Sequence, residues 1–335
     1  MARTSCSGVR IAAGVFFITT ILLISFTPTP VKAPQLRGVE SDSGRDAHAK
    51  VSAGPIAAPG QMQMQIPPIL YGTAWKKGRT KSLVEAAILA GFRGVDTACQ
   101  PKHYLESGVG EALQSLYAQG VVTRADLFLQ TKFTSLGGQD PQDVPYDKDA
   151  PLAEQVRQSV QTSLRNLHTP YIDSLLLHSP LPQITDTLAV WRAMEEAVDG
   201  HLVRQIGISN VYDLATLRQI YDAARVKPAL LQNRFYKRSG WDAQVRRFCE
   251  EKGIVYQSFW TLTGNPQIVK SPEVALLAAK YQKTPQQMMF MFVRALDIVP
   301  LTGTTSSTHM QEDLDSLKTP LDPADVAVMA ALLVP

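Results

Sequence analysis

Residues 174–179 read SLLLHS, a short apolar run that ends in a polar residue. Short apolar runs of this kind recur along the chain, and their number and spacing decide the fold. Seven other runs of similar length are rich in β-branched, aromatic or leucine side chains. They are PILYGTAW (68–75), FRGVDTA (92–98), LFLQTKF (127–133), RQIGISN (204–210), LLQNRF (230–235), VYQSFW (255–260) and IVPLTG (298–303). Short runs of this kind indicate buried strands.

Longer stretches with apolar residues at helical spacing separate the strand candidates, for example TKSLVEAAILAG and EQVRQSVQTSLRNL. Several of them end at glycine or are followed by proline, as a helix end requires. Eight such strand and helix units predict an α/β fold, a closed (β/α)₈ TIM barrel. An open doubly wound sheet is the alternative. Its dinucleotide fingerprint is not met, because GVGEAL at 108–113 lacks the third glycine and lies in a predicted helix.

Composition excludes some classes of partner. The formal net charge is +3 over 335 residues, and basic residues are scattered among acidic ones, so we expect no nucleic-acid partner. The three cysteines, Cys6, Cys99 and Cys249, form no CxxC pair and have no histidine at zinc spacing. We therefore expect neither a disulfide framework nor a metal site.

The first residues differ from the rest of the chain. Arg3 and Arg10 precede IAAGVFFITTILLISF (11–26), an uncharged and mostly apolar run. A basic flank before such a run is typical of a targeting segment. At about 1.5 Å per residue the run is shorter than the ~30 Å hydrocarbon core of a membrane, so its length does not decide between a cleaved signal peptide and a signal anchor. Both interpretations of residues 1–32 stay open.

Either interpretation directs the protein to the endomembrane system or secretory pathway. A retained segment would anchor it to the membrane in a single pass through residues 11–26, and organelle targeting is the alternative. Residues 33–65 show no sustained apolar period and are predicted to be a disordered linker. The expected organisation is therefore the N-terminal segment (1–32), the linker (33–65) and a barrel domain (66–335).

Polar residues stand at the C-terminal ends of successive predicted strands, where a barrel carries its chemistry. They are Asp96, Lys132, His178, Ser209, Asn210 and Gln232. Each one alone is compatible with a cap, a rim or a turn. Together they present a carboxylate, an ammonium, an imidazole and amides at one mouth, and Asp96 supplies the charge partner that a buried Lys132 requires.

A resemblance to a known family rests on several of these segments. GFRGVDTA, followed by Tyr104 and Glu106, then VGEAL, LQTKF, LLLHSP, IGISN and VPLTGTT with HMQEDL, resemble in that order the segments of the aldo-keto reductases. The resemblance implies an oxidoreductase that transfers a hydride from NADPH to the carbonyl of an aldehyde or ketone. It also implies a catalytic tetrad of Asp96, Tyr104, Lys132 and His178.

In this implied tetrad Tyr104 is the general acid that protonates the carbonyl oxygen. Lys132 stabilises the phenolate that is left, Asp96 keeps Lys132 charged, and His178 orients the carbonyl. Trp75 and His103 are implied as substrate-pocket residues. The resemblance further implies that NADPH binds in an extended pose across the barrel mouth. Its expected ligands are Gly72, Thr73, Ser209, Asn210, Gln232, Phe259, Trp260, Leu262, Thr302, Gly303, Thr304, His309, Glu312 and Asp313.

Two departures from the family pattern matter. Leu301 stands where many members have a lysine aimed at the 2′-phosphate, so NADH is not excluded as the cofactor. In the loop TACQPKHYLE (97–106) the family spacing puts Pro101 in the tyrosine's place, whereas counting back without gaps from the following VG puts His103 there. Tyr104 suits the chemistry better, because a nearby lysine stabilises a phenolate, and we assign the acid to Tyr104 with His103 as the alternative.

Two other functions stay open. Lys132 could form a Schiff base, as in an aldolase-type lyase, or the barrel could be a catalytically silent cofactor-binding subunit. In the leading interpretation the partner is a small-molecule carbonyl substrate of undetermined identity, and we expect a monomer or a weak oligomer.

Overall fold

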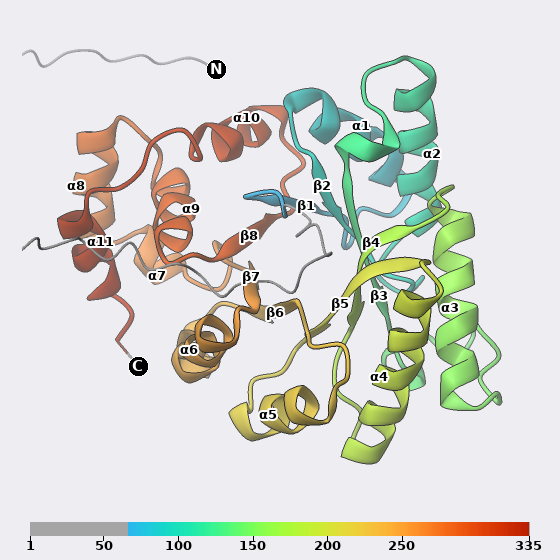
Figure 1. The fold of residues 1–335 in the computed structure, drawn as a ribbon. Coiled ribbons are helices and arrows are strands. Elements are labelled where there is room, and N and C mark those ends of the chain that lie inside the picture. Colours follow the sequence, from blue (N-terminus) through green and yellow to red (C-terminus); the bar gives the residue numbers. More distant parts are fainter. Residues whose placement is uncertain (1–65, 335) are drawn as a thin grey trace, which may run out of the picture. The chain divides into compact units, whose positions relative to one another are not determined.

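A closed barrel of eight parallel strands forms the centre of the computed structural model, which describes residues 66–334 (Figure 1). The strands are β1 (Leu70–Gly72), β2 (Gly94–Asp96), β3 (Phe128–Phe133), β4 (Ile172–Leu177), β5 (Val203–Ser209), β6 (Leu230–Arg234), β7 (Val255–Phe259) and β8 (Val299–Thr302). Each strand pairs with the next, and β8 pairs with β1, where Leu70 lies opposite Leu301. The pairing of β8 with β1 confirms the predicted TIM barrel and excludes the open sheet.

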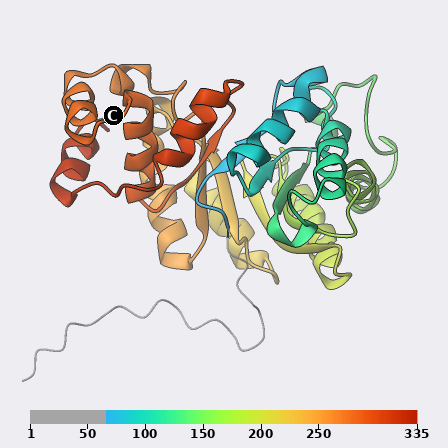
Figure 2. The same cartoon turned by 90° about the horizontal axis from the view of Figure 1, so that it is seen from above.

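Helices surround the barrel (Figure 1). They are α1 (Thr80–Ala90), α2 (Glu106–Ala118), α3 (Leu152–Asn166), α4 (Ile184–Asp199), α5 (Leu214–Ala223), α6 (Ala243–Lys252), α7 (Pro266–Val269), α8 (Pro272–Tyr281), α9 (Pro285–Ala295), α10 (Ser307–Asp315) and α11 (Pro323–Ala330). Figure 2 shows the red and orange α8–α11 gathered on one side and the blue-green α1 and α2 on the other. The extra helices α7 and α8 lie between β7 and α9 in the chain, beside the end of β7 that borders the site described below.

Local sequence explains where several helices begin. Thr284 precedes α9 and accepts a hydrogen bond from the backbone of Gln287, while the Gln287 side chain accepts one from the backbone of Thr284. This capping box, with Pro285 in the first turn, starts the helix sharply.

In α2, a Cβ added at Gly110 would lie 2.0 Å from the backbone oxygen of Asn166. Glycine at this position therefore allows α2 and α3 to approach closely, which matters for a buried carboxylate described below.

The two ends of the barrel interior differ in chemistry. Leu70, Phe128 and Val299 stand at or near the N-terminal ends of their strands and pack together as a small apolar cluster. Larger apolar clusters fill the layer between the strands and the helices. Polar side chains occupy the interior toward the C-terminal ends of the strands. The barrel is thus closed by apolar packing at one end and carries its polar groups at the other.

The predicted N-terminal segment (1–32) and linker (33–65) lie outside the described residues. The boundary of the barrel domain at residue 66 therefore stays a prediction. Within residues 66–334 no helix is both long enough and apolar enough to cross a membrane.

Candidate active site

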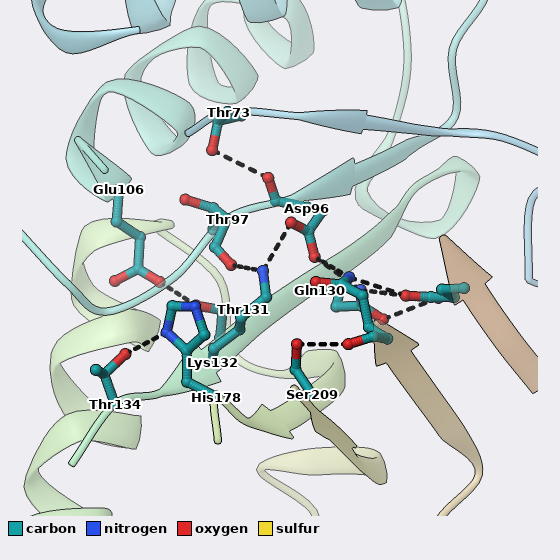
Figure 3. Close-up of polar contacts among 12 residues, drawn as sticks. Thr73, Asp96, Thr97, Glu106, Gln130, Thr131, Lys132, Thr134, His178 and Ser209 are labelled. Carbon is teal, nitrogen blue, oxygen red and sulfur yellow. Dashed lines mark hydrogen bonds and ion pairs between the residues drawn. The ribbon is translucent and has the colours of Figure 1, made fainter. Parts of the chain in front are cut away.

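Four side chains meet at the C-terminal end of the barrel, and Figure 3 shows three of them, Asp96, Lys132 and His178. Asp96 is the last residue of β2, Lys132 is the last but one of β3, and His178 follows β4 directly. Tyr104 lies in the loop between β2 and α2. The strand positions follow from the order of the barrel, in which β2, β3 and β4 are neighbours. Three successive strands therefore carry the carboxylate, the ammonium and the imidazole to one place.

Asp96 and Lys132 form a buried ion pair. Lys132 Nζ lies 2.7 Å from Asp96 Oδ2 and also donates to the backbone oxygen of Thr97 at 2.8 Å. Only 1% of the Lys132 side chain and 4% of the Asp96 side chain are exposed. Burial lowers the pKa of Lys132, and Asp96 opposes this by favouring the charged form. The ammonium therefore depends on the carboxylate to stay protonated inside the barrel.

Two glutamines bind the second oxygen of this carboxylate, and a third glutamine binds those two. Asp96 Oδ1 accepts hydrogen bonds from Gln130 Nε2 at 2.7 Å and from Gln232 Nε2 at 2.9 Å. Gln257 Oε1 accepts from the same two amide nitrogens, at 2.8 Å from Gln130 and 3.0 Å from Gln232. Hydrogen bonds to the charged form of a carboxylate stabilise that form. The three side chains, called here the glutamine cage, hold the Asp96 carboxylate in place and aimed at Lys132.

Sequence reasoning missed two members of the glutamine cage. Gln130 stands two residues before Lys132 in β3, and Gln257 stands two residues before Phe259 in β7. Because side chains alternate along a strand, each glutamine faces the same side as its neighbour two residues on, and that spacing was an available signal. Gln232 is one of the NADPH ligands that the family resemblance implies. Its Nε2 is engaged by the carboxylate and the cage, which leaves its Oε1 as the acceptor available to a ligand.

Tyr104 lies beside the ion pair. Its ring centroid is 5.4 Å from Lys132 Nζ and 6.1 Å from the centroid of the His178 ring. The phenolic hydroxyl makes no hydrogen bond with the described residues, and Tyr104 lines the cavity described below. Burial, and secondarily the charge of Asp96, raise the pKa of Tyr104 far above its ordinary value. The group is therefore a protonated phenol whose donor is not used by any of residues 66–334.

His178 is held as a neutral imidazole. Its Nδ1 lies 2.6 Å from the Thr134 hydroxyl, which fixes the orientation of the ring. Burial, together with the charges of Lys132 and His103, lowers the pKa of His178 to about 3. At neutral pH the ring therefore carries one proton, and the nitrogen that does not contact Thr134 is available to a ligand.

The two candidate acids of the loop 97–106 have different neighbours. The His103 ring stacks on Trp75, with 4.0 Å between ring centroids, and His103 Nδ1 lies 3.0 Å from Gln100 Oε1. The backbone nitrogen of Trp75 also donates to the backbone oxygen of His103 at 2.7 Å. His103 thus belongs to the wall formed with Trp75, while the Tyr104 ring lies next to Lys132.

A buried carboxylate lies behind Lys132. Glu106, the first residue of α2, accepts a hydrogen bond from the Thr131 hydroxyl at 2.5 Å and one from Asn166 Nδ2 at 3.1 Å. Burial raises the pKa of Glu106. The close approach of α2 and α3 at Gly110 brings Asn166 to this carboxylate. Glu106 thereby ties the loop that carries Tyr104 to β3 and α3.

A cavity of about 980 Å³ opens above these residues. Its lining includes nearly all the residues that the family resemblance implied. They are Gly72, Trp75, Asp96, His103, Tyr104, His178, Ser209, Asn210, Gln232, Phe259, Trp260, Leu262, Thr302, Gly303, Thr304, His309, Glu312 and Asp313. Thr73 is an exception: it is fully buried and its hydroxyl donates to the backbone oxygen of Asp96 at 3.0 Å. Thr73 therefore supports the end of β2 from behind.

At one end of the cavity the polar groups after β5 are tied to each other. Ser209 Oγ donates to the backbone oxygen of Gln232 at 2.6 Å, and Asn210 Nδ2 donates to the backbone oxygen of His178 at 2.8 Å. Asn210 adopts a positive φ of 58°, a conformation that asparagine tolerates better than most residues. The bonds connect the ends of β4, β5 and β6 and leave Ser209 and Asn210 at the cavity wall.

The other end of the cavity lies at β8 and α10. The Thr302 hydroxyl donates to Asp313 Oδ2 at 2.7 Å, and burial raises the pKa of Asp313 to about 6. Lys76 Nζ donates to the backbone oxygen of Gly303, although Lys76 was not among the expected site residues. Its position directly after Trp75 was the available signal. Lys76 therefore brings a cation to the β8 end of the cavity, where Leu301 carries no charge.

Comparison with known proteins agrees with this geometry. A family model described as the aldo/keto reductase family matches residues 62–334. Aldo-keto reductase family 4 member C11 of Arabidopsis thaliana is 28% identical over 276 residues, covering 76% of this chain and 81% of that protein. The NAD(P)H-dependent D-xylose reductase of Pachysolen tannophilus is 29% identical over 275 residues, covering 70% and 81%.

A solved structure gives the same result for the fold. The aldo/keto reductase from Brucella melitensis has 25% sequence identity and a TM-score of 0.66, covering 80% of this chain and 95% of that one. Because the family model spans all the described residues, the chain belongs to the aldo/keto reductase family of NAD(P)H-dependent oxidoreductases.

Proposed function

We propose that the protein is an NADPH-dependent reductase of aldehydes or ketones in which Tyr104 is the general acid. The observation that carries this proposal is the Tyr104 phenol, which has no hydrogen-bond partner among residues 66–334 and lies 5.4 Å, ring centroid to Nζ, from the buried ammonium of Lys132. Several relatives are named as carbonyl reductases, including an NAD/NADP-dependent indole-3-acetaldehyde reductase of Schizosaccharomyces pombe.

The residues of the cavity fit a nicotinamide dinucleotide. Gln232 Oε1 is an unused acceptor for the carboxamide, and the Phe259 ring offers the flat apolar face on which a nicotinamide stacks. Lys76, together with the backbone at the start of α10, suits phosphate groups at the other end. An aldo-keto reductase of Bombyx mori has been solved in complex with NADP. Bound in this cavity, NADPH would supply the hydride.

The side chains of the tetrad then handle the proton. As the hydride reaches the carbonyl carbon, negative charge develops on the carbonyl oxygen, and Tyr104 donates its phenolic proton there. The Lys132 ammonium stabilises the phenolate that remains, and Asp96 with the glutamine cage keeps that ammonium charged. If the Thr134 hydroxyl donates to His178 Nδ1, Nε2 carries the ring proton and donates to the carbonyl oxygen.

The burial of Lys132 argues against the Schiff-base alternative. Its Nζ is engaged by Asp96 Oδ2 and the backbone oxygen of Thr97, and only 1% of the side chain is exposed. An amine that attacks a carbonyl must reach the substrate as a free base. Lys132 does not line the cavity, whereas Tyr104 and His178 do. The geometry therefore favours a lysine that acts through the tyrosine.

The two loop residues provide the test. Tyr104→Phe should lower kcat for aldehyde reduction by about 10²- to 10⁴-fold, because it removes the acid. NADPH affinity, measured by quenching of cofactor fluorescence, should stay within about twofold, since the ring is kept. His103→Gln is the matched control and should keep most of the rate. A large loss in His103→Gln with an active Tyr104→Phe would assign the acid to His103, and a wild type that does not bind NADPH would reject the reductase.

Location is a separate proposal that rests on residues 1–32, outside the described part of the chain. We propose that this segment targets the protein to the secretory pathway or anchors it in a membrane. Expression with and without residues 1–32, followed by cell fractionation and carbonate extraction, tests this. Identical soluble fractions for both forms would reject it.

A further inference from the structure

Arg234 is the last residue of β6, and its side chain lies among aromatic rings. The guanidinium carbon is 3.8 Å from the centroid of the Trp260 ring, 5.3 Å from that of Tyr236 and 5.6 Å from that of Phe259. A guanidinium stacked on an aromatic face is held in one plane and keeps its edge free for hydrogen bonds. The stacking therefore positions Arg234 without using its donors.

The guanidinium donors of Arg234 have no acceptor among residues 66–334. Among residues 66–334 no acidic side chain lies within ion-pair distance of Arg234, and its buried Nε has no hydrogen-bond partner. Arg124 is an instructive contrast, because it stacks on Tyr171 at 3.9 Å and also binds Asp173 Oδ2 at 2.7 Å. A buried donor without an acceptor costs free energy. The arginine at the end of β6 thus lacks the carboxylate that a comparable arginine has.

The unpaired guanidinium of Arg234 belongs to a residue of the cavity wall. Arg234 lines the cavity and is paired with Phe259 across β6 and β7. Its backbone nitrogen donates to the Tyr212 hydroxyl oxygen at 3.1 Å, and that hydroxyl donates to Asn210 Oδ1 at 3.2 Å. The guanidinium therefore stands beside the ring that is expected to contact the nicotinamide, on a backbone tied to β5.

We propose that Arg234 binds an oxyanion in this cavity, a carboxylate or a phosphate group. The planar fork of an arginine matches the two oxygens of such a group. The oxyanion has two chemical sources: a carboxylate on the carbonyl substrate or the diphosphate of the cofactor. Lys76 already serves the β8 side of the cavity, at Gly303, so the place of Arg234 beside Phe259 favours the substrate carboxylate. This inference rests on the proposed reductase function.

Binding measurements without turnover test the inference. Wild type, Arg234→Gln and Arg234→Lys are titrated by calorimetry with NADPH, and then, in the presence of NADP⁺, with 4-formylbenzoate and its methyl ester. The ester has the same ring and aldehyde but no charge. Arg218→Gln is the control, since Arg218 is exposed on α5, stacks on Phe248 at 5.6 Å and lies outside the cavity lining.

If Arg234 binds a carboxylate of the substrate, Arg234→Gln should weaken 4-formylbenzoate binding by about 10- to 100-fold and leave binding of the ester and of NADPH unchanged. If Arg234 binds the diphosphate of the cofactor, Arg234→Gln should weaken NADPH binding by a similar factor instead. In either case Arg234→Lys should recover only part of the affinity, because the ammonium lacks the fork. The inference is overturned if Arg234→Gln matches Arg218→Gln for every ligand. Failure of the reductase function itself would be seen separately, as a wild type that does not bind NADPH.

Discussion

Replacing Asp96 with asparagine tests whether the buried ion pair organises the site. In the protein, Oδ2 accepts from Lys132, and Oδ1 accepts from Gln130 and Gln232. Asparagine has one oxygen and one NH₂ group in these two places. Turning the oxygen to the glutamines points the NH₂ at the ammonium, and the opposite orientation points it at the two amide donors. Both arrangements set donor against donor, so no rotation of the new side chain restores the contacts.

The size of the effect follows from burial. Removing one partner of a buried ion pair costs about 3–5 kcal/mol, because the other charge is left unpaired. For a domain of this size class each kcal/mol lowers Tm by about 2–4 °C, so Asp96→Asn should lower Tm by about 6–20 °C. The pKa of Lys132, already lowered by burial, should fall further without Asp96. Between that lowered pKa and the ordinary lysine value the unfolded chain binds more protons, so the stability of the variant should rise with pH in that window.

Thermal unfolding of wild type, Asp96→Asn and Asp199→Asn gives the assay. Asp199 is a matched control because it pairs with Arg225 at 2.6 Å, but its side chain is 57% exposed. An exposed pair contributes about 1 kcal/mol or less. The double variant Asp96→Asn with Lys132→Met should regain part of the lost stability, since it leaves no unpaired buried charge. Equal Tm shifts in the two single variants would refute the reasoning, as would a double variant less stable than Asp96→Asn alone.

Three further predictions follow from single residues. Gln130→Leu removes one donor to the carboxylate and should lower kcat by about tenfold with NADPH affinity unchanged; a loss confined to NADPH binding would contradict the role of the cage. The pKa of His178 is lowered to about 3 in the folded protein, so as pH falls the His178 imidazole becomes protonated in the unfolded chain at a higher pH than in the folded protein. Stability should therefore drop between about pH 6.5 and 3, by at most ~1.4 kcal/mol per unit, and His178→Gln should flatten this slope in urea titrations; an unchanged slope would count against it. Asp313, with a pKa of about 6, is mostly ionised at pH 7.5. Asp313→Asn should raise the preference for NADPH over NADH by about two- to fivefold in binding titrations, since it removes a negative charge near the expected 2′-phosphate; equal changes for both cofactors would contradict this.

The strand positions were predictable from local sequence because parallel strands covered by helices are buried on both faces. Each therefore reads as a short apolar run, and each predicted run overlaps an observed strand. The bounds differ: β4 and β5 begin before their runs, at Ile172 and Val203, and FRGVDTA at 92–98 contains β2 only at Gly94–Asp96. Thr97 lies just beyond it, and its backbone oxygen accepts from Lys132. Hydrophobic pattern locates a strand, but it does not mark the residue at which ladder pairing ends.

The glutamine cage and Arg234 could not be found in the same way. A glutamine inside an apolar run is compatible with an edge, a rim or a solvent contact when the run is considered alone. Gln257 becomes a partner of Gln130 only because the barrel closes and brings β3 and β7 across from each other. Arg234 was likewise an ordinary polar residue after LLQN until the structure showed its stacking on Trp260 and the absence of an acid beside it within residues 66–334.

The sequence by itself determined the order of strands and helices, the residue types at the strand ends and the resemblance that led to the tetrad, because these are local patterns. The tertiary structure alone decided how Asp96 is held, since Gln232 reaches it across 136 residues of chain. It also decided the neighbours of the two candidate acids in TACQPKHYLE, with Tyr104 beside Lys132 and His103 on Trp75. The reason is physical: counting along a loop with an insertion does not give the direction of a side chain, whereas packing against distant strands does.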